Sequence, residues 1–508
     1  MDSLLQLASG VLTCLEPFNF FVLMIGITVG MVVGFLPGLN LVIGVLLVLP
    51  FTYKMDITPA LILLSGLYVA GTYGGAFTAI LFRIPGDPIH VPFLWDGHAM
   101  AKAGRPSMAL GWTLFAALGG GLISAVIMVV LTKPVANFAL RFSSPEYFTI
   151  VLFGLASVVS LARGSLANAL ISLCLGLVIA TVGTDTTYGA ARFTFGAPIL
   201  ADGIEFLVVM VGAYGVGEVL ARVERGFTIA KVESSKTSKT DLPSLREVSA
   251  VKGMFLRSTI LGTIIGIIPG AGATIASFVS YGVEGQIGKR KELMGTGIQE
   301  GIVAPQAAAT ASVGGAMVPL LAIGIPGSGA TAVMLGAFTL HGVQPGPQVF
   351  LTSAGMIYAI FASIFLSLII MSVLGYFAIR PLVAILELPE AIVSAFVMVF
   401  CFIGALSIRS DVTDLWLMIA FGIVGYIFER LKFPIAPMVL GVILGPLAEE
   451  SFLNSMISYG NDWTVFVTRP ISAVLVVLTA LVLLVPLLGA MRYRPPVVEP
   501  ETGAKRGA

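Results

Sequence analysis

The chain has 508 residues, of which 57% are hydrophobic and only 11% are charged, and its mean hydropathy is +1.00. A soluble domain carries roughly 25% charged residues, so this chain lacks the polar surface that a soluble protein of its length needs. The formal net charge of +1 excludes a nucleic-acid binder that works through a concentrated basic face. The composition therefore predicts a multi-pass membrane protein.

Apolar runs that approach the length of a membrane span recur along the whole chain. About 20 apolar residues cross the hydrocarbon core of a bilayer as a helix. In chain order the candidates are Phe18–Leu36, Ala60–Phe82, Ala109–Leu131, Tyr147–Leu161, Ala167–Val182, Ile204–Leu220, Phe255–Ile268, Ala307–Ile325, Gln348–Leu374, Ile392–Leu406, Leu415–Phe428, Pro434–Leu447 and Ser472–Leu488. Some are too short for a full span, so we expect an all-α fold with about 12 crossings.

The cysteines and histidines show no spacing typical of a disulfide framework or a zinc site. They are Cys14, Cys174, Cys401, His90, His98 and His341. The stretch from Met1 to Pro17 contains no Lys or Arg, so it lacks the basic region of a signal peptide, and the first apolar segment is expected to stay in the protein.

One long polar segment, Arg222 to Arg257, separates two groups of apolar runs. It is rich in Lys and Arg, which the positive-inside rule places in the cytoplasm. We therefore expect a first membrane repeat over 1–221, a basic cytoplasmic linker over 222–257, a second membrane repeat with additional C-terminal helices over 258–491, and a cytoplasmic tail over 492–508.

Pro-Gly pairs occur in the same order in both halves. Pro269 follows Pro37 by 232 residues (269 − 37), and Pro326 follows Pro85 by 241 (326 − 85). Matched helix breaks in two halves indicate a substrate site near the membrane midplane in secondary transporters. Residues 1–53 contain no Lys or Arg, which favours an external N-terminus, whereas the second half starts from the basic linker. The two halves are therefore expected to be inverted, with broken helices or hairpins at the Pro-Gly motifs.

Longer stretches around these motifs resemble the TctA family, the large membrane subunit of the tripartite tricarboxylate transporters. They are GFLPGLN at 34–40, YGGAFTAILFRIPGDP at 73–88, WDGHAMAKAGRPSMALG at 95–111, GIIPGAGATIASFVSYGVEG at 266–285, GTGIQEGIVAPQ at 295–306, PLLAIGIPGSGATAVMLGAF at 319–338 and HGVQPGPQVF at 341–350. The resemblance extends over most of the chain, from Pro17 to Leu488.

The resemblance implies a permease of the bacterial inner membrane with no enzyme activity and no cofactor. It implies two protein partners, a small TctB-like membrane subunit and a periplasmic TctC-like solute-binding protein. It also implies uptake of a di- or tricarboxylate coupled to a Na⁺ or H⁺ gradient. The chain lacks a P-loop, so direct use of ATP is not expected. The choice of coupling ion, the carboxylate and a homodimeric state stay open.

The residues at the Pro-Gly breaks are the candidate substrate ligands. Backbone N–H groups at a helix N-terminus stabilise a carboxylate, and glycine lets a ligand approach the backbone closely. The candidates are Gly38, Asn40, Gly86, Asp87, Gly270, Gly272, Thr274, Gly327, Ser328 and Thr331, and carbonyl groups near Pro37 and Pro269 are candidate Na⁺ ligands. The alternatives are a simple kink or packing notch at each break and, for Asp87, a local ion pair with Arg83 or a position at the membrane interface.

The chain departs from the family pattern at positions that bear on recognition. Where the family pattern resembles EAANNA, this chain has QAAATA at 306–311, from Gln306 to Ala311. Asp87 replaces the threonine of IPGTP, and Asn40 replaces the last glycine of PGLG. A membrane site has few polar groups, so these exchanges leave the identity of the carboxylate undetermined.

Two other functions are compatible with a polytopic chain. A passive anion channel requires polar or charged rings along its spans, whereas intramembrane charge is sparse here. An intramembrane enzyme requires a motif such as GxGD, GxSxG or HExxH, and the chain contains none of them. A secondary transporter that works by alternating access, with the Pro-Gly regions moving against a helical scaffold, is the expected function.

Overall fold

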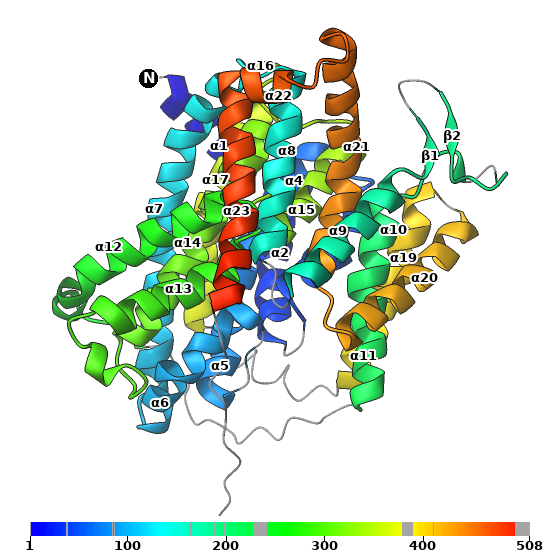
Figure 1. The fold of residues 1–508 in the computed structure, drawn as a ribbon. Coiled ribbons are helices and arrows are strands. Elements are labelled where there is room, and N and C mark those ends of the chain that lie inside the picture. The colour runs from blue at the N-terminus through cyan, green and yellow to red at the C-terminus, as the bar shows by residue number, and fades with distance from the viewer. Residues whose placement is uncertain are drawn as a thin grey trace, which may run out of the picture.

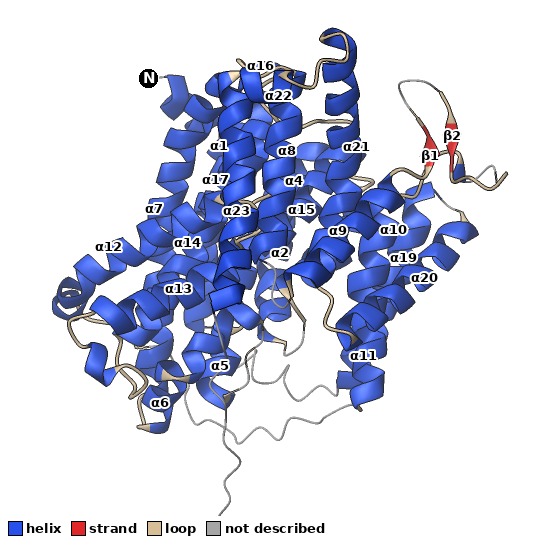
Figure 2. Cartoon of the chain, viewed as in Figure 1, coloured by secondary structure: helices blue, strands red, loops and turns tan. Residues whose placement is uncertain are grey.

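The computed structural model describes residues 2–36, 39–83, 85, 87–161, 165–185, 189–197, 200–226, 241–377, 390–409 and 411–492. Helices make up the body of the protein (Figures 1 and 2). The strands in these residues are the short antiparallel pair β1 (Gly183–Thr184) and β2 (Ala191–Arg192), which project from the helical body in Figure 2.

The helices in chain order are α1 (Asp2–Leu15), α2 (Pro17–Phe35), α3 (Leu41–Thr52), α4 (Ile57–Gly74), α5 (Ala76–Phe82), the 3-10 helix η1 (Pro88–Leu94), α6 (Asp96–Lys102), α7 (Pro106–Ala139), α8 (Ser144–Leu161), α9 (Leu166–Ala180), α10 (Phe206–Met210), the π-helical turn η3 (Val211–Val216), α11 (Gly217–Arg225), α12 (Leu245–Ile267), α13 (Gly272–Ile287), the 3-10 helix η4 (Lys291–Leu293), α14 (Glu300–Ile323), α15 (Gly329–Leu340), α16 (Val349–Thr352), α17 (Ala354–Phe377), α19 (Glu390–Arg409), α20 (Val412–Arg430), α21 (Ile435–Ser458), α22 (Val465–Thr468) and α23 (Pro470–Arg492).

Nine helical spans within the described residues are long and apolar enough to cross a membrane. Shorter apolar helices, among them α3, α8, α9 and α15, lie in the same body. The all-helical, multi-pass prediction is thereby confirmed at the level of helix type and composition. The expected number of about 12 crossings stays a prediction.

The predicted spans agree with most of the long helices, but α12 begins ten residues before the predicted start at Phe255. Its first turn is closed by a capping box, in which the Ser244 N–H donates to Glu247 Oε2 (2.8 Å) and the Glu247 N–H donates to Ser244 Oγ (3.4 Å). The apolar pattern does not predict this turn because the turn is polar. Residues 227–240 of the predicted linker and residues 493–508 of the predicted tail lie outside the described part of the chain.

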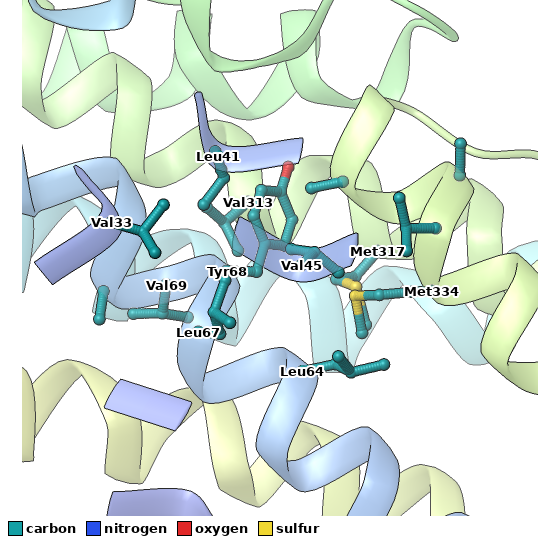
Figure 3. Close-up of a cluster of buried hydrophobic side chains, with 14 of the residues drawn as sticks. Val33, Leu41, Val45, Leu64, Leu67, Tyr68, Val69, Val313, Met317 and Met334 are labelled. Atoms are coloured by element: carbon teal, nitrogen blue, oxygen red, sulfur yellow. The ribbon is translucent and has the colours of Figure 1, made fainter. Parts of the chain in front are cut away.

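Helices α4 and α14 occupy the centre of the molecule and are enclosed by other helices. Figure 3 shows the apolar side chains that meet there from α2, α3, α4, α14 and α15. A helix that is apolar on all sides is stable only when its neighbours cover every face, so α4 and α14 form the core around which the broken helices are arranged.

Glycines bring α2 and α12 into backbone contact with these two central helices. A Cβ on Gly30 or Gly34 would overlap the carbonyl oxygen of Leu67 or approach that of Gly71 in α4. In α12, a Cβ on Gly262 or Gly266 would overlap the backbone of Ala308 or Ser312 in α14. Small residues four apart allow such close packing in membranes, where contact surface rather than water exclusion holds helices together.

Candidate substrate site

In the first half, two side chains cap the N-terminus of α3, directly after the first Pro-Gly break. Asn40 Oδ1 accepts from the Ile43 N–H at 2.9 Å, as an ordinary N-cap residue does. Asp87, from the second break, reaches the same helix end, where its Oδ2 accepts from the Leu41 N–H at 2.9 Å. A carboxylate of the protein itself therefore occupies the anion-binding end of α3.

Asp87 also holds the second break of this half in place. Its Oδ1 accepts from the Ile89 N–H at 3.1 Å and caps η1, and its side chain is buried. Among the described residues Asp87 makes no ion pair with Arg83, so the alternative of a local ion pair is wrong. Arg83 instead ends α5 in a left-handed conformation, with φ 58°.

In the second half, the two breaks touch each other through the backbone. The Gly270 N–H donates to the Gly327 carbonyl at 3.1 Å. Gly270 and Gly272 have φ values of +80° and +59°, which a residue with a side chain adopts only with strain. A Cβ on Gly272 would lie 3.4 Å from the Cβ of Ser328, so the beginnings of α13 and α15 adjoin.

Ser328 and Thr331 cap α15 reciprocally. The Thr331 N–H donates to Ser328 Oγ (3.2 Å), and the Ser328 N–H donates to Thr331 Oγ1 (2.8 Å). Both residues are buried. The Tyr68 hydroxyl, at the edge of the apolar cluster of Figure 3, lies 2.9 Å from Ser328 Oγ. A polar group of α4 therefore reaches the second-half break across the core.

The two halves differ at the helices that follow their first break. Helix α3 has two side-chain caps, whereas α13 has none, and its N-cap residue is Ala271. The first N–H groups of any helix lack helical acceptors, so the beginning of α13 presents donors that no side chain of the described residues satisfies. Thr274 lies in this first turn and is half-buried.

The structure brings most of the predicted site residues into one region. Gly270, Gly272, Gly327, Ser328 and Thr331 form the junction of α13 and α15. Asn40 and Asp87 meet at the start of α3, which packs against α15, since a Cβ on Gly329 would lie 2.8 Å from Val42 Cγ2. Gly38, Gly86 and Pro37 lie outside the described residues, and Pro269 is buried at the α12–α13 break.

The sequence did not single out Tyr68, which lies inside an apolar run and 260 residues from its partner Ser328. The sequence pattern also gave no site role to Asp96, which lies in the stretch 95–111 that resembles the family. Asp96 is fully buried and accepts from Tyr281 Oη (2.8 Å) and from the N–H groups of Gly295 (2.9 Å), Gly297 (2.9 Å) and Ile298 (3.0 Å). It ties α6 to the loop that leads into α14.

The fold and the junction of α13 and α15 together define a class of membrane protein. This is a helical membrane protein in which broken helices meet inside the body and present helix N-termini and a few polar groups, as secondary transporters do. The model of the Tripartite tricarboxylate transporter TctA family matches residues 20–440, and the chain belongs to that family.

Two relatives from Agrobacterium vitis are similar to this chain. The protein described as "Uncharacterized 52.8 kDa protein in TAR-I ttuC' 3'region" is 35% identical over 498 residues, which cover 97% of this chain and 98% of the relative. The one described as "Uncharacterized protein in TAR-II ttuC' 3'region" is 36% identical over 233 residues, 46% of this chain and 96% of the relative. No solved structure matches the chain.

Family membership confirms that the chain is a multi-pass membrane transporter of a tricarboxylate transporter family. A TctA protein is a permease without enzymatic activity, so the intramembrane enzyme alternative is wrong.

Proposed function

We propose that this chain is the permease of a three-component system that imports a di- or tricarboxylate across the bacterial inner membrane. A periplasmic TctC-like binding protein delivers the substrate, a small TctB-like membrane subunit completes the complex, and an inward Na⁺ or H⁺ gradient drives accumulation. The tripartite character of the family supports the two partners. Sparse intramembrane charge argues against a passive anion channel.

The uncapped beginning of α13 beside Ser328 carries this proposal. A carboxylate that enters a membrane loses its hydration shell, so it needs hydrogen-bond donors of the protein in place of water. The first turn of α13 offers the positive end of a helix dipole and N–H groups that no described side chain caps, and Ser328 Oγ and Tyr68 Oη lie next to it. The Asp87 carboxylate already fills the corresponding position at α3, so one free anion position is left at this junction.

Reconstitution tests the function directly. Proteoliposomes that contain the chain and its two partner subunits are expected to accumulate one of a panel of labelled di- and tricarboxylates under an imposed Na⁺ or H⁺ gradient. Accumulation above the outside concentration distinguishes a transporter from a channel, which only equilibrates its solute. Equilibration without any driving ion, or no uptake of any acid by folded protein, would contradict the proposal.

Replacement of Ser328 by alanine is expected to weaken substrate binding. Loss of one hydrogen bond to a charged group costs about 1.5–3 kcal/mol, so KM should rise by about tenfold or more. Ser328→Thr keeps the hydroxyl and should retain most of the affinity. The control is Ser363→Ala, because Ser363 is also buried but donates to the Ile360 carbonyl of its own helix. An unchanged KM for Ser328→Ala in the uptake assay would remove Ser328 from the site.

We further propose that the two membrane halves are related, inverted repeats. The backbone contacts support this relation, since each contacting glycine of α12 follows one of α2 by 232 residues, the separation of Pro37 and Pro269 (269 − 37). Their partners in α14 follow those in α4 by 241 residues, the separation of Pro85 and Pro326 (326 − 85). Helices α6 and α11 end on the same side of the body in Figure 1 and carry Lys102 and Arg225, which favours a cytoplasmic location for that side.

Alternating access requires the two halves to change their contacts during transport. A disulfide between Val42→Cys in α3 and Gly329→Cys in α15 is therefore expected to trap one state and stop uptake. A Cβ at residue 329 would lie 2.8 Å from Val42 Cγ2, which is close enough for a disulfide between cysteines at these two positions. The measurement is uptake before and after reduction, in a background with Cys174→Ser because Cys174 is exposed.

The matched control for this bridge lies within one half. Gly44 of α3 and Val33 of α2 are equally close, and the pair Val33→Cys and Gly44→Cys should leave uptake intact. If uptake continues while the bridge between α3 and α15 is formed, the moving parts of the transporter lie elsewhere.

A further inference from the structure

A buried polar cluster joins the first-half break to the two central helices. His90 of η1 and Gln306 of α14 are both fully buried, and both direct a nitrogen at the carbonyl oxygen of Thr72 in α4. The distances to this oxygen are 3.1 Å from His90 Nε2 and 3.3 Å from Gln306 Nε2. Thr72 lies in the last turn of α4, where a carbonyl lacks its helical N–H partner.

The shared Thr72 carbonyl determines the tautomer of His90 and the orientation of the Gln306 amide. A carbonyl oxygen only accepts, so the hydrogen of a neutral His90 ring must lie on Nε2, and Nδ1 is then an acceptor. Gln306 must direct its NH₂ group at Thr72 for the same reason, and this group also donates to Thr310 Oγ1 at 2.9 Å. Within the described residues, neither His90 Nδ1 nor Gln306 Oε1 makes a hydrogen bond of good geometry, although the Asp87 carbonyl lies near the His90 ring.

Two buried acceptors without a hydrogen bond need a donor when the transporter works. A carboxylate only accepts, so the cluster does not suit the substrate. A hard cation such as Na⁺ prefers oxygen ligands and does not satisfy an imidazole nitrogen. A proton does, because it binds Nδ1 covalently and converts one of the two acceptors into a donor.

We propose that His90 Nδ1 is the proton-binding atom that couples the proton gradient to transport. This inference rests on the proposed function and selects H⁺ as the coupling ion. The proton passes from water to Nδ1, and the ring becomes an imidazolium without loss of its Nε2–H bond to Thr72.

Protonation would act on the site through Asp87, which precedes His90 by three residues on the same break. The new positive charge attracts the Asp87 carboxylate, which in the structure caps α3 through Leu41. As this carboxylate turns toward the imidazolium, the N–H groups at the start of α3 lose their internal anion. Proton binding thereby prepares α3 to accept a substrate carboxylate beside the junction with α15.

The other ionisable groups on the elements around His90 are already engaged. Helices α5, α6, α13 and α14 pack against η1, and α4 supplies Thr72. Asp96 accepts hydrogen bonds from four donors, one of which is Tyr281. Glu284 pairs with Arg257, Glu300 pairs with Arg290, and His98 Nδ1 bonds the Ile80 carbonyl. Lys102 is exposed, Arg83 ends α5, and the Tyr73 hydroxyl of α4 lies beside Thr113 but has no hydrogen bond of good geometry within the described residues.

A proton-jump measurement tests His90 without knowledge of the substrate. In proteoliposomes adsorbed on a solid-supported electrode, a substrate-free proton jump is expected to displace charge in the wild type. His90→Gln should reduce this displacement to the level of protein-free liposomes. His98→Gln is the matched control and should retain it. A signal that persists in His90→Gln, a wild type without signal, or a response to Na⁺ alone would each overturn the proposal.

Nitrogen-15 labelling of histidine provides a second test that leaves His90 in place. The chain contains three histidines, so a variant with His98→Gln and His341→Gln leaves one imidazole signal. At high pH this ring is expected to show a bare Nδ1 and a protonated Nε2, and on acidification Nδ1 should gain a proton. A ring that carries its hydrogen on Nδ1, or that never titrates in the folded protein, would overturn the proposal.

The uptake assay separates this inference from the proposed function. Uptake that depends on Na⁺ and is unaffected by His90→Gln would leave a carboxylate transporter in place and remove the proton site. Proton-dependent charge displacement without uptake of any carboxylate would keep the proton site and refute the substrate class.

Discussion

Gly262→Ala is expected to disrupt the packing of α12 on α14 and to lower the stability of the protein by about 3 kcal/mol or more. The new Cβ would overlap the carbonyl oxygen and press on the Cα of Ala308, which are backbone atoms that cannot rotate away. Because α14 is enclosed on all sides, the strain has no free surface to relax into. The measurement is thermal unfolding of purified protein, followed by fluorescence and size-exclusion chromatography.

Gly253, two and a half turns earlier on the same helix, is the matched control. A Cβ at this position meets no atom of the described residues within 4 Å. Gly253→Ala should therefore be neutral or stabilise α12 by about 0.5–1 kcal/mol, the usual difference between alanine and glycine in a helix. Equal stability of the two variants would mean that α12 and α14 are not in backbone contact.

Asp96→Ala is expected to release the loop before α14 and to cost several kcal/mol of stability. It removes the shared acceptor of four donors, and each buried donor left unpaired costs about 1–3 kcal/mol. The expected result is a lower unfolding temperature and faster proteolysis within residues 294–299. Uptake should also fall, because this loop positions the start of α14.

Two variants test whether the effect comes from the hydrogen bonds. Asp96→Asn keeps one acceptor oxygen, so it should destabilise less than Asp96→Ala. Asp56→Ala removes an exposed carboxylate that makes no side-chain cap at the start of α4, and it should change stability little. Similar unfolding temperatures for Asp96→Ala and Asp56→Ala would show that the buried carboxylate does not hold the loop.

The apolar runs were sufficient to predict the long helices because burial in lipid requires continuous apolar sequence. They were insufficient for α13 and α15, which start at Gly272 and Gly329 and are shorter than a full span. The Pro-Gly motifs located the helix breaks, and Ser328 and Thr331 lie at one of them as expected. The cap that Asn40 adds to α3, where α13 has Ala271, is local, but the second cap depends on Asp87 reaching Leu41 across 46 residues, which local sequence does not specify.

The sequence by itself determined the class of protein, the positions of most of the long helices and the places where they break, because these depend on composition and on the local chemistry of proline and glycine. Only the tertiary structure decided which breaks meet, that Tyr68 reaches Ser328, and that His90 and Gln306 share the Thr72 carbonyl. Those contacts join residues far apart in the chain. They follow from how closely glycine lets the helices approach, which is a property of the packed molecule.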